Sequence, residues 1–168
     1  MARKAVAGGT PATVALDRGG VPWTAHPYEH DPGAASYGLE AAQALGVEPA
    51  RVFKTLLVRL EPAGAAPGGL AVGVVPVDRQ LDLKAVAAAV GAKRATMAPP
   101  DVAERTTGYV VGGISPLGQK RPLRTVVDVS ALAHPTVYVS GGRRGFDVEL
   151  TAADLVRLTA ASTAPIAR

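Results

Sequence analysis

One stretch of the chain, Gly108–Gln119 (GYVVGGISPLGQ), combines the features of a ligand-binding loop. Its β-branched residues predict a short strand over 109–111, ending at a Gly-Gly pair where the backbone bends or approaches a ligand closely. Because glycine has no Cβ, a ligand can lie against the amides of residues 112–115, while Pro116 fixes φ and removes one donor. A plain turn after a strand would have the same composition, so both interpretations stay open.

Three catalytic motifs do not match this stretch. A P-loop needs lysine where Gln119 stands, and Ser or Thr after it. A nucleophile elbow needs G-x-S-x-G, and Pro116 follows Ser115 without an N–H for an oxyanion hole. The glycine pattern of a dinucleotide-binding fold is absent. Ser115 is therefore a poor nucleophile, and the chain has no cysteine to supply a thiolate.

Two further segments carry chemically useful side chains. Period-two alternation in the predicted strand 53–60 places Lys54 among aliphatic residues, so its ammonium either leaves at the strand end or serves a pocket. The glycine-rich turn at 140–147 (SGGRRGFD) can present polar groups to a pocket mouth or be an ordinary hairpin turn. The cluster at 26–31 contains two histidines and two carboxylates, but Pro27 interrupts their helical spacing, and we predict no metal site.

Composition predicts one globular domain spanning residues 1–168, with 1–9 as a loose end. Hydrophobic residues make up 48% of the chain and aromatics only 4%, so the core is aliphatic. The net charge of +4 gathers in pairs and triplets such as Lys120/Arg121/Arg124, which indicates a polyanionic partner or a solvated basic face. We see no membrane span or signal peptide and expect a cytoplasmic protein.

Periodicity and capping residues predict alternating helices and strands. The expected helices cover 11–19, 36–45, 82–90, 100–106 and 151–160. The expected strands cover 21–25, 53–60, 70–77, 93–97, 125–129, 136–140 and 146–150. Pro76 indicates an edge strand or a bulge, and the tail to Arg168 is expected to fray. This order predicts an α+β domain with a mixed sheet that is curved or closed.

Taken together, several segments resemble the YbaK/EbsC family. They read YEHDP (28–32), YGLEAA (37–42), VFKTLLV (52–58), VVPV (74–77), LDLKAVAAAVGAK (81–93), TGYVVGGISPLGQK (107–120) and YVSGGRRGFDVEL (138–150). Members are free-standing Cys-tRNA(Pro) deacylases related to the editing domain of bacterial prolyl-tRNA synthetases. The likeness covers the chain from about residue 10, in order. The segment KRPLRT (120–125) departs from the family pattern at a predicted tRNA-facing edge.

The resemblance implies an α/β domain with a barrel-like mixed sheet surrounded by helices. It implies ester hydrolysis of mischarged tRNA without a metal, a cofactor or a protein nucleophile, the substrate thiol assisting. Lys54 matches the essential lysine, and Gly112 belongs to the catalytic loop. The residues implied to contact substrate are Tyr28, Tyr37, Thr55, Gly113, Ile114, Ser115, Pro116, Ser140, Arg144 and Asp147.

Two alternatives remain at this point. The first is an Ala-tRNA(Pro) deacylase of the related editing family. The second is a non-catalytic module that binds nucleotides or tRNA ends. The resemblance makes prolyl-tRNA synthetase a possible partner, and few residues here are suited to reading base edges, so intrinsic discrimination among tRNAs is expected to be weak. The sequence does not predict an oligomeric state.

Overall fold

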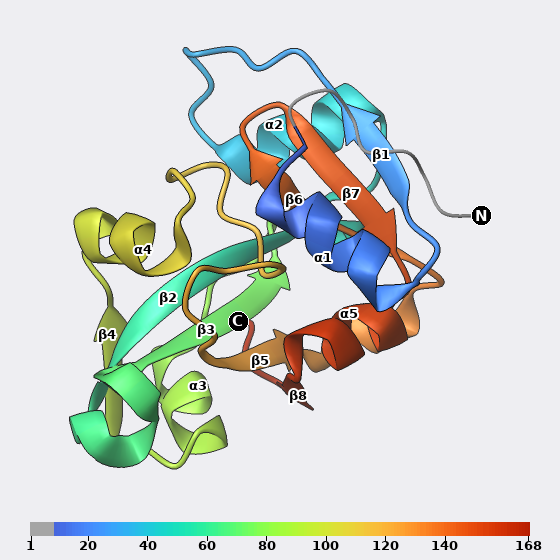
Figure 1. Ribbon diagram of the computed structural model, residues 1–168. Helices are drawn as coiled ribbons and strands as arrows, with labels where there is room; N and C mark the ends of the chain where they lie inside the picture. Colours follow the sequence, from blue (N-terminus) through green and yellow to red (C-terminus); the bar gives the residue numbers. More distant parts are fainter. Residues whose placement is uncertain (1–8) are drawn as a thin grey trace.

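The computed structural model describes residues 9–168 and forms one α+β domain (Figure 1). The predicted loose end lies almost entirely outside these residues. The helices are α1 (Pro11–Gly19), α2 (Tyr37–Leu45), α3 (Leu83–Ala89), α4 (Pro100–Thr107) and α5 (Ala152–Thr159). The strands are β1 (Thr24–Pro27), β2 (Phe53–Glu61), β3 (Leu70–Pro76), β4 (Arg94–Met97), β5 (Arg124–Asp128), β6 (Val137–Arg143), β7 (Phe146–Leu150) and β8 (Ser162–Ala164). Short 3₁₀ turns occupy Pro49–Arg51, Ala63–Ala65, Pro67–Gly69 and Val129–Ala133.

The strands form two sheets, where the resemblance implied one barrel-like sheet. The larger has the order β4-β2-β3-β5-β8, with β3–β5 and β5–β8 parallel and the other pairs antiparallel. The smaller is antiparallel, in the order β1-β7-β6. A single parallel bridge between Val52 and Tyr138 links them. Because no ladder continues beyond that bridge, the sheets do not close into a barrel.

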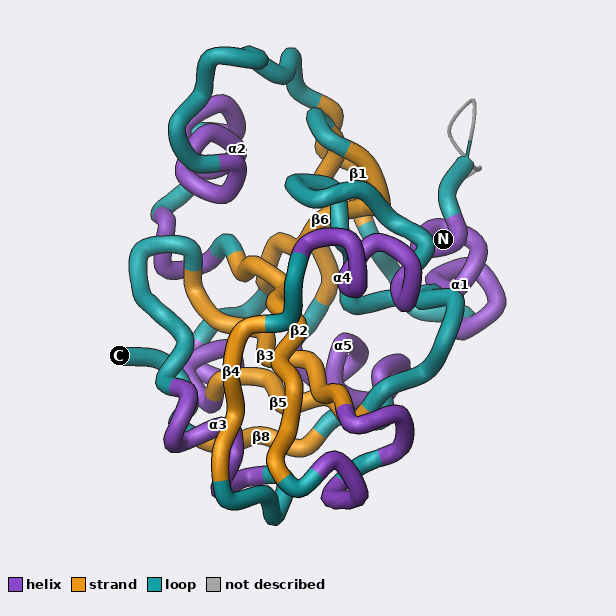
Figure 2. Tube along the Cα trace, turned by 90° about the vertical axis from the view of Figure 1, so that its left-hand side faces the viewer, coloured by secondary structure: helices purple, strands orange, loops and turns teal. Residues whose placement is uncertain are grey.

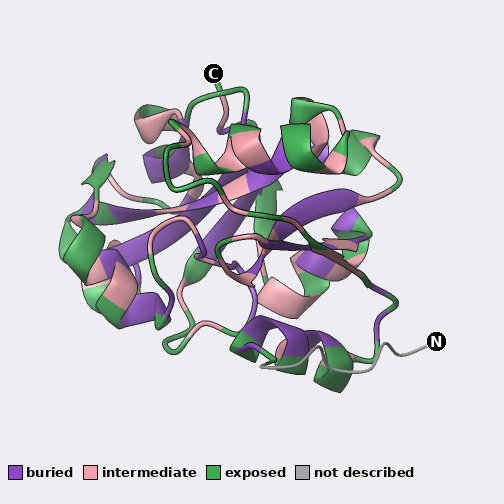
Figure 3. Ribbon diagram, turned by 90° about the horizontal axis from the view of Figure 1, so that it is seen from above, coloured by how far each residue is buried: buried purple, intermediate pink, exposed green. Residues whose placement is uncertain are grey.

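The larger sheet is the central layer of the domain. On one face, Val86 and Ala87 of α3 pack against the sheet. On the other, α1, α4, α5 and the smaller sheet enclose the main core, in which Leu16, Ala103 and Leu155 take part. Figure 2 shows strands β2, β3, β4, β5 and β8 of the larger sheet beside one another, and Figure 3 shows that burial follows the strands and the inner sides of the helices. No helix within residues 9–168 is long and apolar enough to cross a membrane.

Local sequence signals set the helix ends as predicted. Thr10 caps α1 in a reciprocal capping box with Thr13. The side chains of Ser36, Asp82 and Thr151 accept hydrogen bonds from the first turns of α2, α3 and α5.

Two predictions about strands were wrong. No strand forms at 109–111, because Tyr109 turns its ring into the main core and donates from its hydroxyl to Leu117 O at 2.7 Å. The proline in β3 does not mark an edge, since β3 lies between β2 and β5. Pairing with β5 ends at Val74, so Pro76 lies where no ladder partner needs its N–H.

The expected frayed tail is instead folded. β8 adds to the edge of β5, and Ile166 is fully buried. Oδ1 of Asp128 accepts the N–H groups of Ile166 and Ala167, each at 2.9 Å. Two smaller differences concern the N-terminal half. The first strand, predicted from residue 21, begins at Thr24. Leu39 of α2 is 45% exposed, although helical periodicity over 36–45 predicts an inward-facing side chain.

Candidate active site

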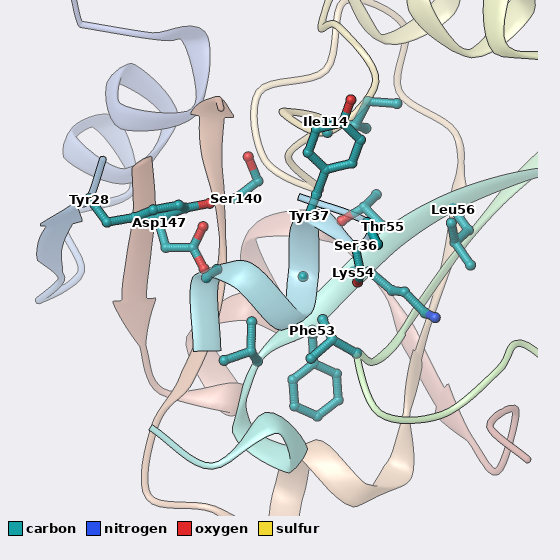
Figure 4. Close-up of a pocket in the computed structure, with 16 residues that line it drawn as sticks. Tyr28, Ser36, Tyr37, Phe53, Lys54, Thr55, Leu56, Ile114, Ser140 and Asp147 are labelled. Atoms are coloured by element: carbon teal, nitrogen blue, oxygen red, sulfur yellow. The ribbon is translucent and has the colours of Figure 1, made fainter. Parts of the chain in front are cut away.

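A cavity of about 300 Å³ opens between the start of β2, the start of α2 and the loop that follows α4 (Figure 4). Eight of the predicted site residues line it: Tyr28, Tyr37, Lys54, Thr55, Gly112, Ile114, Ser140 and Asp147. The remaining lining residues are Ala35, Ser36, Gly38, Ala41, Val52, Phe53, Leu56 and Val77. Segments far apart in the sequence therefore converge on one concave site, the usual form of a small-molecule pocket.

Strand pairing explains how several of these side chains meet. Residues 53–55 are the first three residues of β2, and all three line the cavity. Because successive side chains of a strand point to opposite faces, both faces of β2 contribute to the cavity. In the smaller sheet, Ser140 of β6 lies opposite Asp147 of β7. The register of that hairpin thus brings a hydroxyl and a carboxyl to the same part of the cavity wall.

The Gly-Gly pair makes two close approaches. Gly112 has φ +88°, and a Cβ there would lie 2.6 Å from Cε1 of Tyr37. A Cβ at Gly113 would lie 2.7 Å from the Cα of Arg143 in the hairpin. The loop is therefore pressed between α2 and the β6–β7 hairpin, and only glycine fits at either position.

Not every residue of the predicted loop reaches the cavity. Gly113, Ser115 and Pro116 are buried and lie outside its lining. The N–H of Gly113 donates to Val110 O at 2.8 Å, and the Ser115 hydroxyl accepts the N–H of Leu117 at 3.2 Å. These buried residues stabilise the conformation of the loop without lining the cavity. Gly112 and Ile114 line the cavity, and their amide N–H groups have no acceptor within residues 9–168.

Arg144 also lies outside the cavity lining, at its rim. Its Nε donates to Val111 O at 2.9 Å, and its guanidinium stands 5.1 Å from the centre of the Tyr37 ring. His30 stacks on Tyr37 with ring centres 5.8 Å apart, and its Nδ1 is 2.8 Å from Oε1 of Glu40. Tyr37 is thus held between a cation and an imidazole over the Gly112 backbone.

Asp147 is the most unusual group in the cavity. It is 5% exposed, and its carboxyl has no hydrogen-bond partner in the part of the chain that the structure describes. Burial raises the pKa of Asp147 to about 7. Burial, with added repulsion from Asp147 and Glu40, raises the pKa of Tyr28 to about 12, so this phenol is neutral near pH 7. Because Asp147 lines the cavity and has no protein partner, a ligand in the cavity could supply one.

Lys54 marks the opposite end of the cavity. Its side chain is half-buried and points away from the group formed by Tyr28, Ser140 and Asp147 (Figure 4). Burial lowers the pKa of Lys54, an effect that the charge of Asp78 partly offsets. Beside it, the hydroxyl of Thr55 is buried without a hydrogen-bond partner in the described chain. The cavity therefore carries an acidic end and a basic end, with the Gly112–Ile114 backbone along its side.

Sequence reasoning missed the residues that contribute shape without charge. Phe53 and Leu56 flank Lys54 on the predicted strand and could have been included by adjacency. Gly38 had a clearer signal, since a glycine inside a predicted helix often marks a close approach. A Cβ at Gly38 would lie 2.3 Å from Cγ1 of Val77. Ser36 was predicted only as the first residue of a helix over 36–45, although it also lines the cavity.

The histidines of the 26–31 cluster bind different carboxylates. His26 Nε2 lies 2.8 Å from Glu149 Oε1, whereas His30 pairs with Glu40. Within residues 9–168, no group of three or more His, Asp or Glu side chains is arranged to hold a metal ion.

Comparison with known proteins identifies the family of this chain. The profile of the aminoacyl-tRNA editing domain family matches residues 31–158. The chain belongs to this family. It is 37% identical over 118 residues to an Enterococcus faecalis (strain ATCC 700802 / V583) protein named "Putative Cys-tRNA(Pro)/Cys-tRNA(Cys) deacylase EbsC", which covers 70% of this chain and 69% of that protein.

Solved structures give the same relationship. A crystal structure described as "a putative trans-editing enzyme for prolyl tRNA synthetase" superposes with a TM-score of 0.77 at 27% identity, over 94% of this chain and 95% of the other. A second, described as a hypothetical protein, has a TM-score of 0.82 at 27% identity, over 95% and 100% of the two chains. The protein is an enzyme of the aminoacyl-tRNA editing type, a hydrolase that acts on aminoacyl-tRNA.

Proposed function

We propose that this protein is a trans-editing deacylase that hydrolyses the ester of Cys-tRNA(Pro). The observation that carries the proposal is the opposite charge at the two ends of one small cavity. An aminoacyl-tRNA terminus has matching ends, because its amino acid bears an ammonium group and its nucleotide bears phosphates. Asp147 would accept the ammonium, and Lys54 would pair with the phosphate or ribose of the terminal adenosine.

The cavity offers no conventional nucleophile to attack the ester. No histidine lines it within the described residues, the chain has no cysteine, and Ser115 is buried behind the wall. Ser140 lines the cavity but lies opposite Asp147 in the hairpin, without an imidazole beside it. The nucleophile is therefore expected to come from the substrate or from water.

Cysteine can supply that nucleophile itself. Its thiol sulfur would attack its own carbonyl carbon, the ester C–O bond would break, and the ribose oxygen would take up the thiol proton. Water would then open the resulting cyclic thioester and release cysteine. Holding the thiol against the carbonyl makes the attack intramolecular, which removes much of the entropic barrier.

The Gly112–Ile114 backbone would stabilise the charge that develops on the carbonyl oxygen. Because the Gly113 amide is already engaged by Val110 O, the proposed donors are the N–H groups of Gly112 and Ile114. A donor of this kind contributes about 2.7–4 kcal/mol to transition-state binding in comparable sites. The unpartnered hydroxyl of Thr55 would form a hydrogen bond with the substrate. Arg144 would act indirectly, by positioning Val111 and Tyr37.

The decisive experiment is a substrate panel with the purified protein. Cys-tRNA(Pro), Ala-tRNA(Pro), Ser-tRNA(Pro) and Cys-tRNA(Cys) are compared by single-turnover deacylation. We expect rapid loss of cysteine and slow loss of alanine and serine. Equal hydrolysis of the alanyl ester would reject thiol assistance and favour the related Ala-tRNA(Pro) activity. Binding of tRNA without hydrolysis of any ester would instead identify a non-catalytic module.

Lys54→Ala and Lys84→Ala form a matched pair for the basic end of the cavity. Lys84 is an exposed lysine on α3, outside the cavity lining. Lys54→Ala should abolish deacylation while leaving the unfolding temperature within a few degrees of the parent, and Lys84→Ala should change neither. Full activity of the Lys54 variant would remove this lysine from the mechanism.

Comparison of the two cysteinyl-tRNAs tests where tRNA selectivity originates. If both are cleaved, discrimination must come from a partner, for which prolyl-tRNA synthetase is the candidate in this proposal. Adding the synthetase should then favour tRNA(Pro). The proposed reaction requires charged tRNA, so the cytoplasmic location expected from the sequence forms part of the same proposal.

A further inference from the structure

A second cavity, further along β2 than the first, is lined in part by three arginines. It measures about 430 Å³ and lies between β2, α4 and the glycine-rich turn after β2. Three of its lining residues are Arg59, Arg105 and Arg121, which come from three different segments. No acidic residue lines it. We propose that this arginine groove binds the phosphodiester backbone of the tRNA acceptor stem, an inference that rests on the function proposed above.

The charges in the arginine groove are largely uncompensated. Arg59 and Arg121 are exposed and have no carboxylate within 4.0 Å in the described chain. Arg105 faces Asp101 at 3.8 Å, but both side chains are more than 70% exposed, and such a pair on a helix surface contributes little. Clustered guanidinium groups without counter-charges suit phosphate oxygens, which they bind in forked geometry.

The groove is also held in a fixed shape. The N–H of Lys120 donates to Thr107 O at 2.9 Å, and that of Arg121 donates to Thr106 O at 3.2 Å. The basic segment after the active-site loop is thereby tied to the end of α4.

The groove lies further along β2 than a single terminal nucleotide bound in the cavity could reach. Thr55 at the cavity and Arg59 at the groove point to the same face of β2, four residues apart. At about 3.3 Å per residue, their Cα atoms are about 13 Å apart, and the side chains extend that span. This separation exceeds one nucleotide, so an ester bound in the cavity would place the groove beside phosphates further along the acceptor end.

Arg121 belongs to the basic segment KRPLRT (120–125), which borders this groove. Because phosphate contacts fix position without reading bases, this groove would add affinity for tRNA and little selectivity among tRNAs.

The test compares a long and a short substrate. The double variant Arg59→Gln/Arg121→Gln removes two positive charges from the groove. Its control, Arg18→Gln/Lys84→Gln, removes two charges from exposed positions on α1 and α3, outside the groove lining. Deacylation is measured on full-length Cys-tRNA(Pro) and on a 3′-cysteinyl CCA trinucleotide, which fills the active-site cavity but carries no stem.

We expect the groove variant to raise KM for the full-length substrate roughly tenfold and to leave the trinucleotide rate unchanged. The slope of log affinity against log salt for uncharged tRNA, followed by fluorescence anisotropy, should become shallower by about 2. The charge control should change neither quantity. An unchanged KM and salt slope, or an equal loss on the trinucleotide, would overturn the proposal.

Failure of the proposed activity gives a different result. If the parent protein cleaves neither ester, the deacylase proposal fails, while the anisotropy measurement still tests the groove. A short RNA duplex and a heparin oligosaccharide of equal charge serve as competitors there. Displacement by the duplex alone supports an acceptor-stem site, and equal displacement by both would reduce the groove to a general anion site and reject the proposal.

Discussion

Replacing Asp147 by asparagine should make the protein more stable and less active. Burial raises the folded-state pKa of this carboxyl to about 7, against 3.8 for the unfolded chain. Between these values the unfolded state releases its proton while the folded state keeps it, so stability falls as pH rises through this window. Above pH 7 the penalty is constant. At about 1.36 kcal/mol per pH unit the penalty reaches about 4.3 kcal/mol at pH 8 and about 1.6 kcal/mol at pH 5.

Asparagine has the same shape but cannot ionise, so Asp147→Asn should lose that penalty. The free energy of unfolding from urea denaturation should therefore rise relative to wild type, by about 2.7 kcal/mol more at pH 8 than at pH 5. Asp101→Asn is the control, because that carboxyl is exposed at the start of α4. It should change stability by about 0.5 kcal/mol or less at both pH values.

The same substitution should weaken deacylation. Loss of a charged partner for the substrate ammonium is expected to lower kcat/KM by about 10- to 150-fold, from about 1.5–3 kcal/mol for such a bond. In the wild type, kcat/KM should rise with pH up to about 7 as Asp147 ionises. A stability difference that does not vary with pH would refute the conclusion that burial raises the pKa of the Asp147 carboxyl. Unaltered kcat/KM would refute its role in binding the amino group.

Three further substitutions test how the site and its scaffold are held. Gly112→Ala introduces a Cβ 2.6 Å from Tyr37 at a residue with φ +88°. The substitution should lower the free energy of unfolding, measured by thermal denaturation, by about 1–3 kcal/mol and lower the deacylation rate at least tenfold. Unchanged stability and activity would mean that the loop has room to move. Arg144→Gln removes the bond to Val111 O and should raise KM with little change in unfolding temperature, whereas a purely structural role would lower the unfolding temperature instead. Asp128→Asn weakens two bonds to the C-terminal tail and should cost about 1–3 kcal/mol in urea denaturation near pH 7. Burial raises the pKa of Asp128, but its hydrogen bonds outweigh burial and lower it overall. The carboxylate's contribution is therefore lost as pH falls through that lowered pKa, so the gap between Asp128→Asn and wild type should narrow in acid.

Helix boundaries and the longest strand could be predicted because local rules decide them. Thr10, Ser36 and Asp82 cap the first turns with their own side chains, and no distant residue is needed for that bond. The strand β2 follows from period-two alternation over nine residues. These signals survive in the fold because packing agrees with them.

The failures share a non-local cause. Residues 109–111 have strand-forming side chains, but Tyr109 is more stable with its ring in the core and its hydroxyl on Leu117 O. β8 exists only because β5, more than thirty residues earlier, offers a parallel edge and Asp128 offers an acceptor. Secondary-structure propensity cannot predict such non-local contacts, because they depend on how the whole chain packs.

Some features of the candidate site could be predicted from the sequence, and others depend on the fold. A resemblance over ordered motifs brought Lys54, Gly112 and Asp147 into consideration, and the structure places all three at one cavity. It could not show which loop amides are already occupied, because Gly113 N–H bonds to Val110 O only in the folded turn. The charge separation between Asp147 and Lys54 likewise appears only when the two sheets are placed together.

The proposed chemistry explains how such a cavity could spare Pro-tRNA(Pro). Proline and cysteine are both small, and a cavity of about 300 Å³ cannot exclude one by size alone. Apolar contacts would separate them by only a few kcal/mol. A site that binds the ammonium, stabilises the oxyanion and withholds a nucleophile discriminates differently: an ester without an internal thiol meets the same donors and still lacks an attacking group. Specificity would then arise from the reactivity of the substrate, so adding a competent nucleophile to this cavity should reduce accuracy while increasing rate.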